Sequence, residues 1–139
     1  MDELKRVGIE YISNREIASN DAVMFDIDDT LIYVNKDPIT PMIKLLYEAK
    51  KMGYNIVLIT ARPGWEEFVK MTVDELNSYN IYYDYLGFTS ATTKTLMKKE
   101  LPYNFILSVG DLETDLTDSM HTLNTSNFSH SWDNSQTPS

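Results

Sequence analysis

Short apolar runs rich in β-branched and aromatic residues alternate with stretches of helical periodicity, and this alternation constrains the fold more than any other feature of the chain. The runs are residues 22–25, 55–59, 82–87 and 105–109. The first, second and fourth are continuously apolar, which is typical of strands buried on both faces of a parallel sheet. The sequence therefore predicts an α/β fold: a doubly wound (Rossmann-like) parallel sheet with helices on both faces.

Cap and turn residues between the runs predict where helices begin and end. Thr40 followed by Pro41 is a typical helix start, and Gly53 is a typical helix stop. The expected helices cover residues 41–52, 63–79 and 93–101, a fourth segment marked by Leu112, Leu116, Met120 and Leu123, and a weaker pattern across residues 4–12.

The length of 139 residues suits one domain, because it can bury a core but is too short for two ordinary ones. We expect residues 1–123 to form this domain. Residues 124–139 are rich in Ser, Thr and Asn and are expected to form a polar tail. Whether this tail is flexible or contains a last strand stays open.

Composition narrows the partners and the compartment. No apolar run is long enough to cross a bilayer, and the first twenty residues lack the pattern of a secretory signal. The absence of cysteine fits a reducing compartment, so a cytoplasmic protein is expected. A net charge of -9 opposes non-specific attachment to a polyanion, so a nucleic acid would take part only as a substrate.

Polar residues follow the predicted strands where ligands bind in this fold, at the carboxyl ends. They are Asp26-Ile-Asp-Asp-Thr30 after the first strand, Thr60-Ala-Arg62 at the second, Lys94 at the start of a helix, and Asp111 and Asp115 after the last strand. Each has an ordinary explanation alone, as a turn, a helix cap or a surface charge. Together these residues predict a ligand-binding site at the carboxyl edge of the sheet. Clustered carboxylates repel one another, so the site calls for a cation, and ligands that are all oxygen favour Mg²⁺.

In this order and spacing the residues resemble the four motifs of the haloacid dehalogenase superfamily of phosphotransferases, across residues 22–115. The resemblance implies that Asp26 attacks the phosphorus of a phosphomonoester and forms an aspartyl-phosphate, which water then hydrolyses. It also implies that Asp28 protonates the leaving oxygen and later deprotonates the water.

The resemblance also implies roles for residues around Asp26 and Asp28. Mg²⁺ would be held by Asp26, the backbone carbonyl of Asp28, and Asp111. The phosphoryl group would be held by Thr60, Lys94 and the backbone at Ile27 and Ala61. The site would be supported by Thr30, Asp115 and Arg62. Asp115 would act through water or by positioning Lys94, and Thr30 would stabilise the loop around Asp28.

Many members of this superfamily carry a cap domain after the first or second motif, but residues 31–59 and 61–93 leave no room for one here. A capless member has an exposed cleft, which goes with a macromolecular phosphate substrate or with a small one when an oligomer covers the site. Residues 41–57 are also similar to the 3′-phosphatase domain of phage polynucleotide kinases. Tyr33, Trp65 and Phe88 are either surfaces on which a base stacks or packing residues.

Two alternatives stay open beside a general phosphatase. One is a polynucleotide 3′-phosphatase or nucleotidase of the same superfamily. The other is a signalling receiver domain that accepts a phosphoryl group without turnover, although a receiver carries its acceptor aspartate before the threonine and needs no carboxylate after the lysine. The physiological substrate is not predicted.

Overall fold

The computed structural model describes residues 1–126; of the predicted polar tail, residues 127–139 lie outside the described part. In chain order the elements are α1 (Asp2–Ile12), β1 (Asp21–Phe25), α2 (Thr40–Met52), β2 (Asn55–Thr60), α3 (Glu66–Ser78), β3 (Tyr85–Phe88), α4 (Lys94–Glu100), β4 (Asn104–Gly110), α5 (Glu113–Leu116) and β5 (His121–Asn124). Strands and helices alternate from β1 onward, as the apolar runs predict.

The strands form one five-stranded parallel sheet in the order β3-β2-β1-β4-β5. The chain runs outward from β1 through β2 to β3 and then returns to the other side of β1 with β4. Phe25, the last residue of β1, lies beside Leu58 of β2 and Val109 of β4. The predicted doubly wound sheet is confirmed, and the strand order reverses between β1 and β4.

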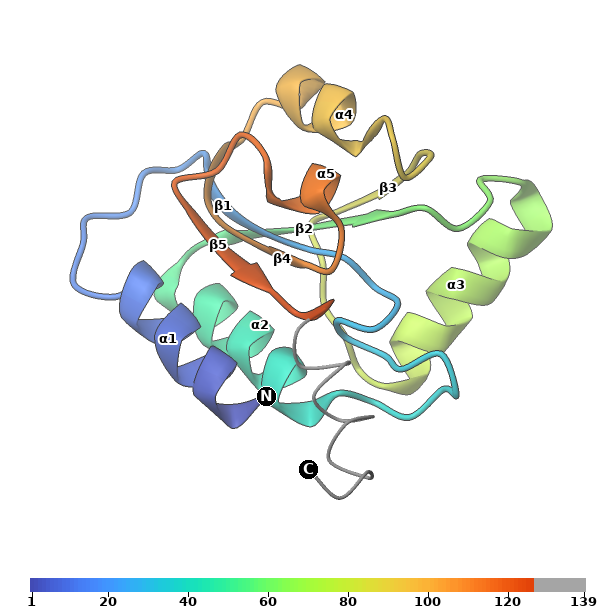
Figure 1. The fold of residues 1–139 in the computed structure, drawn as a ribbon, viewed down its shortest axis with the longest axis horizontal. Helices are drawn as coiled ribbons and strands as arrows, with labels where there is room; N and C mark the ends of the chain where they lie inside the picture. The colour runs from blue at the N-terminus through green and yellow to red at the C-terminus, as the bar shows by residue number, and fades with distance from the viewer. Residues whose placement is uncertain (127–139) are drawn as a thin grey trace, which may run out of the picture.

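Helices cover both faces of this sheet, with α1 and α2 on one side and α4 and α5 on the other (Figure 1). Successive residues of β1 point to opposite faces, and both sets are fully buried. Val23 and Phe25 belong to the core shared with α1 and α2, whereas Ala22 and Met24 belong to a smaller core that contacts Met97 of α4. Two-sided burial explains the continuously apolar strands and leaves the carboxyl edge of the sheet for a ligand.

The predicted helix across residues 112–123 is wrong. The structure has only the single turn of α5, and the chain then reverses through Asp118, whose φ is 53°, into β5. Backbone pairing with β4 takes over, because the N–H of Met120 donates to the carbonyl of Phe105 and that of Thr125 to Gly110. The helical spacing misled because Leu123 is buried but Met120 is 59% exposed, so the apolar residues do not share one face.

Connections after the first two strands are short. A loop joins β1 to α2, and α3 with its flanking turns joins β2 to β3. No cap domain is inserted anywhere in residues 1–126, in agreement with the prediction. None of the helices in this part of the chain has the length and apolar character needed to cross a bilayer.

Candidate functional site

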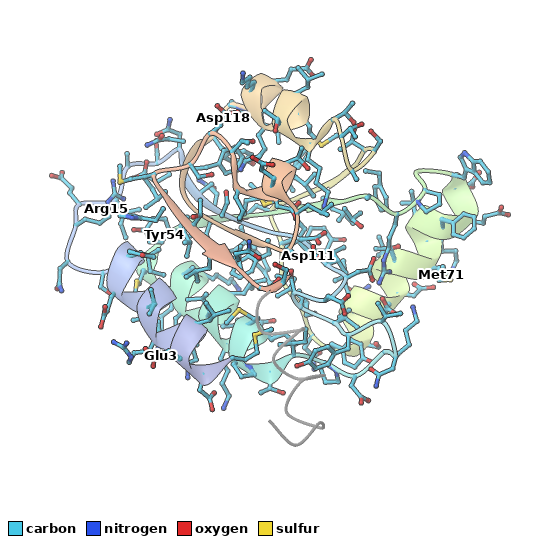
Figure 2. All side chains as sticks on the ribbon, viewed as in Figure 1. Glu3, Arg15, Tyr54, Met71, Asp111 and Asp118 are labelled. Atoms are coloured by element: carbon cyan, nitrogen blue, oxygen red, sulfur yellow. The ribbon has the colours of Figure 1, made fainter. Side chains whose placement is uncertain are left out.

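Asp26 and Asp111 directly follow β1 and β4, the neighbouring strands between which the strand order reverses. Ligands of doubly wound sheets bind in the crevice at this point. The N–H of Asp26 donates to the carbonyl of Val109 at 2.9 Å, so the parallel ladder continues one residue past β1. Asp111 lies near the carboxyl end of β4 (Figure 2). The sheet itself therefore brings these two carboxylates together.

Lys94, the first residue of α4, places a buried ammonium group between two carboxylates. Its Nζ lies 2.9 Å from Asp26 Oδ1 and 2.7 Å from Asp115 Oδ1, and all three side chains are almost fully buried. Burial lowers the pKa of Lys94, but Asp26 and Asp115 more than offset this effect and raise the pKa above its usual value. Lys94 is thus a fixed positive charge in the site, and removing either partner would leave a buried charge less compensated.

Asp115 is positioned by the backbone on either side of it. The N–H of Leu112 donates to Asp115 Oδ2 at 3.0 Å. The lack of a side chain at Gly110 admits the carboxylate, since a Cβ there would lie 2.5 Å from Asp115 Cβ and Oδ2. Asp115 Oδ1 is buried and accepts no hydrogen bond from the described residues, although Lys94 lies in ion-pair contact. A carboxylate oxygen carries more than one lone pair, so Asp115 Oδ1 can contact Lys94 and still help to bind a cation.

The carboxylates of Asp26, Asp111 and Asp115 fit a metal ion. Each offers one oxygen atom, and the three oxygens lie within 4.8 Å of one another. Burial, followed by the charge of Asp115, raises the pKa of Asp26 well above its usual range against the opposing attraction of Lys94. A divalent cation would relieve this crowding of negative charge, and a donor set made only of oxygen suits Mg²⁺. Asp115, predicted as a supporting residue, joins this cluster.

Asp28 is held by Arg62 rather than by the acidic cluster. Arg62 donates through Nε to Asp28 Oδ2 at 3.1 Å and through Nη2 to Oδ1 at 2.8 Å, which is a two-point contact. Arg62 also donates to Glu75 Oε1 at 2.7 Å and to Thr72 Oγ1 at 3.2 Å, both on α3. The Asp28 side chain remains 42% exposed, so it faces the solvent side of the site. The predicted role of its backbone carbonyl as a metal ligand stays a prediction.

The loop after β1 is tightly folded. The carbonyl of Ile27 accepts hydrogen bonds from the N–H groups of Thr30, Leu31 and Ile32 at 3.2, 2.9 and 3.1 Å. Thr30 Oγ1 lies 3.2 Å from Thr125 Oγ1, ninety-five residues along the chain, so the loop is tied to the segment after β5. This loop therefore presents Asp26 and Asp28 from a rigid support.

The end of β2 lies beside this loop. Thr60 is fully buried, and its Oγ1 accepts from the N–H of Arg62 at 3.1 Å. Ala61 lines a hollow of about 250 Å³ together with Phe88 and Ser90. The predicted roles of Thr60, Ala61 and Ile27 in binding a phosphoryl group stay predictions.

Sequence reasoning missed Lys98, which is buried one helical turn after Lys94. Its Nζ lies within hydrogen-bond distance of four oxygens, which its three N–H groups share: Ser108 Oγ at 2.9 Å, Ser119 Oγ at 3.0 Å, the carbonyl of Asp115 at 2.8 Å and the carbonyl of Thr117. Burial lowers the pKa of Lys98 to about 8. Lys98 fixes the backbone of α5 beneath Asp115. The sequence feature that could have identified Lys98 is its spacing of four residues from Lys94, which places both ammonium groups on one face of α4.

Arg62 also has partners that sequence reasoning missed. Thr72 and Glu75 belong to no motif in the sequence. They lie three residues apart, so they share one face of α3, and both contact Arg62.

Trp65 is 69% exposed and packs edge to face on Phe68, so it is not a core residue.

No protein-family model matches the sequence, but the fold is similar to that of solved structures. A chain of the Pnkp1/Rnl/Hen1 complex has a TM-score of 0.62 and 22% identity over 75% of this chain. A chain of the Pnkp1/Rnl/Hen1 RNA repair complex has a TM-score of 0.61, again with 22% identity over 75% of this chain. The present chain spans 43% and 40% of the length of these two chains. At this identity the likeness shows a shared fold.

Proposed function

We propose that the chain is a Mg²⁺-dependent phosphomonoester hydrolase of the haloacid dehalogenase type, with Asp26 as its nucleophile. The observation that carries this proposal is the buried group of Asp26, Lys94 and Asp115, next to Asp111 at the reversal of strand order. A carboxylate, an ammonium group and a candidate cation site within one cluster are the parts that phosphoryl transfer needs.

In the proposed reaction an oxygen of Asp26 attacks phosphorus, and the bond from phosphorus to the ester oxygen breaks. The leaving oxygen takes the electron pair of that bond and a proton from Asp28. Water then attacks the phosphorus of the aspartyl-phosphate and gives a proton to Asp28. The bond between Asp26 and phosphorus breaks, which releases inorganic phosphate and returns both residues to their starting states.

The other residues bind and orient. Lys94 would neutralise charge that develops on the phosphoryl oxygens, while Thr60 and the backbone N–H groups near Ile27 would hold them. Mg²⁺, held by Asp26, Asp111 and the carbonyl of Asp28, with Asp115 supporting it through water, would supply positive charge that offsets the repulsion between Asp26 and the phosphate. Arg62 would orient Asp28 toward the leaving oxygen through its two-point contact.

The substrate class is the second part of the proposal. A nucleotidase or polynucleotide 3′-phosphatase is favoured among phosphomonoesterases by the similarity of residues 41–57 to phage 3′-phosphatase domains and by the fold shared with a chain of an RNA repair complex. A receiver domain is disfavoured, because Asp111 and Asp115 both lie at the site beside Lys94.

The test is phosphate release from an aryl phosphate with and without Mg²⁺. We expect Mg²⁺-dependent turnover that Asp26→Asn abolishes, because an amide cannot form the acyl phosphate. Asp74→Asn, a change at an exposed carboxylate of α3, is the matched control and is expected to retain full activity. Turnover by the Asp26→Asn variant at the wild-type rate would disprove the mechanism, and a long-lived phosphorylated protein without turnover would indicate a receiver.

A further inference from the structure

A hollow of about 340 Å³ opens immediately beside Asp28 and Arg62. It lies between the loop that follows β1 and the first turns of α3. In the proposed reaction Asp28 gives its proton to the leaving oxygen, so whatever is attached to that oxygen must extend past Asp28. The hollow is therefore the space that the leaving group of the substrate would enter.

The walls of this hollow are more apolar than a solvent-exposed surface requires. Val34 comes from the loop, and Phe68 and Met71 come from α3. Figure 2 shows Met71 on this helix. Val34 is 68% exposed and Met71 is 50% exposed, so two large apolar side chains from separate elements border one opening. Single exposed apolar residues need no explanation, but their convergence around a proposed reaction centre is typical of a ligand site.

Ion pairs fasten the two walls to each other. Glu75 of α3 accepts from Arg62 at 2.7 Å and lies 3.2 Å from Lys36 Nζ through its other oxygen. The hydroxyl of Tyr79 donates to the carbonyl of Lys36. Asp28, Arg62, Glu75 and Lys36 thus form a continuous chain of opposite charges from the reaction centre to the outer loop. The hollow is held open before a substrate arrives, which lowers the entropic cost of binding.

We propose that this hollow binds the base of a free nucleoside monophosphate while its phosphate lies at Asp26, an assignment that rests on the proposed hydrolase function. The faces of a heteroaromatic ring can pack on the apolar side chains of the hollow, and its polar edge can hydrogen-bond to the charged groups beside them. A sugar alone would gain little from Val34 and Met71. The net charge of -9 disfavours a long polyanion, and a volume of about 340 Å³ lies at the lower end of ligand pockets, which suits one nucleoside.

The test compares adenosine 5′-monophosphate with ribose 5-phosphate, which share the leaving oxygen and differ only in the base. Adenosine 3′-monophosphate and a 3′-phosphorylated oligonucleotide are run beside them. We expect kcat/KM for adenosine 5′-monophosphate to exceed that for ribose 5-phosphate by at least about tenfold, in the range that apolar pockets provide. The double variant Val34→Ser with Met71→Ser should bring this ratio close to one.

The matched control is Leu96→Ser with Met120→Ser, which removes two apolar side chains that are each 59% exposed and do not line the hollow. This control should keep the wild-type ratio. A ratio near one in the wild type, or an unchanged ratio in the Val34 and Met71 variant, would overturn the assignment. So would an oligonucleotide preferred over both mononucleotides, because the proposal commits to the free nucleotide.

A binding measurement separates this assignment from the hydrolase function. In the Asp26→Asn protein with Mg²⁺, the methyl signal of Met71 is followed by NMR during titration with adenosine 5′-monophosphate and with ribose 5-phosphate. A shift with the nucleotide alone supports the base site even if no phosphate is released. If the wild-type protein hydrolyses ribose 5-phosphate but the Met71 signal of the Asp26→Asn protein does not respond to the nucleotide, the hydrolase function stands and the base site is rejected.

Discussion

Gly110→Ala is a change of one methyl group that should act on the site through Asp115. The added Cβ would lie 2.5 Å from both Cβ and Oδ2 of Asp115 and 2.6 Å from its Cγ. Carbon atoms in contact are about 3.5 Å apart, so Asp115 must move by about 1 Å. A change of rotamer cannot relieve the contact with Cβ, and the backbone of α5 has to shift with it.

The magnitude follows from the pair that Asp115 makes with Lys94. Their closest atoms lie 2.7 Å apart. A retreat of about 1 Å weakens the attraction by about 2 kcal/mol at an effective dielectric constant of about 20. Overpacking a filled site destabilises the folded protein by ~1–3 kcal/mol. Alanine also restricts the unfolded chain more than glycine does, and this offsets less than ~1 kcal/mol of the loss. We expect the free energy of unfolding to fall by about 3 kcal/mol, together with weaker binding of Mg²⁺.

Urea unfolding measures the first effect and isothermal titration with Mg²⁺ measures the second. Gly64→Ala is the matched control, because its Cβ would meet only Phe88, at 3.3 Å and beyond. The control should stay within ~0.5 kcal/mol of wild type, as surface substitutions usually do. A Gly110→Ala protein with wild-type stability and wild-type affinity for Mg²⁺ would refute the placement of Asp115.

Two further predictions concern cationic side chains. Lys98 has a pKa of about 8 in the folded protein and about 10.4 when unfolded. The unfolded chain therefore binds more protons between these values, and the free energy of unfolding should rise with pH across this window by up to about 3 kcal/mol; urea titrations from pH 7 to 11 should show this rise in wild type and not in Lys98→Met. In the Arg62→Lys variant, the lysine cannot make the two-point contact with Asp28 while also reaching Glu75. Steady-state kinetics should therefore show kcat lowered by roughly 100-fold with a smaller change in KM. An unchanged kcat would exclude a positioning role for Arg62.

The order of elements was accessible from sequence because it depends on local patterns. Strands buried on both faces have to be continuously apolar, and Pro41 in the first turn and Gly53 at the C-cap mark α2 without reference to the rest of the fold. The predicted cap at Thr40 is wrong, because Thr40 is the first residue of the helix and Ile39 precedes it at the N-cap without a side-chain hydrogen bond. The same reasoning failed at residues 112–123, where apolar spacing suited a helix but pairing with β4 decided the outcome. Pairing between β5 and β4 depends on contacts that lie outside the segment whose apolar spacing was read.

The positions of the candidate site residues were also determined by sequence alone, because parallel strands end at one edge and residues that follow them must gather there. Which of them touch was decided only by tertiary structure. The two-point contact of Arg62 with Asp28, and the approach of Asp115 to Lys94 through the space left at Gly110, join residues from different elements. Side-chain direction depends on how those elements pack, and packing is a property of the whole folded chain.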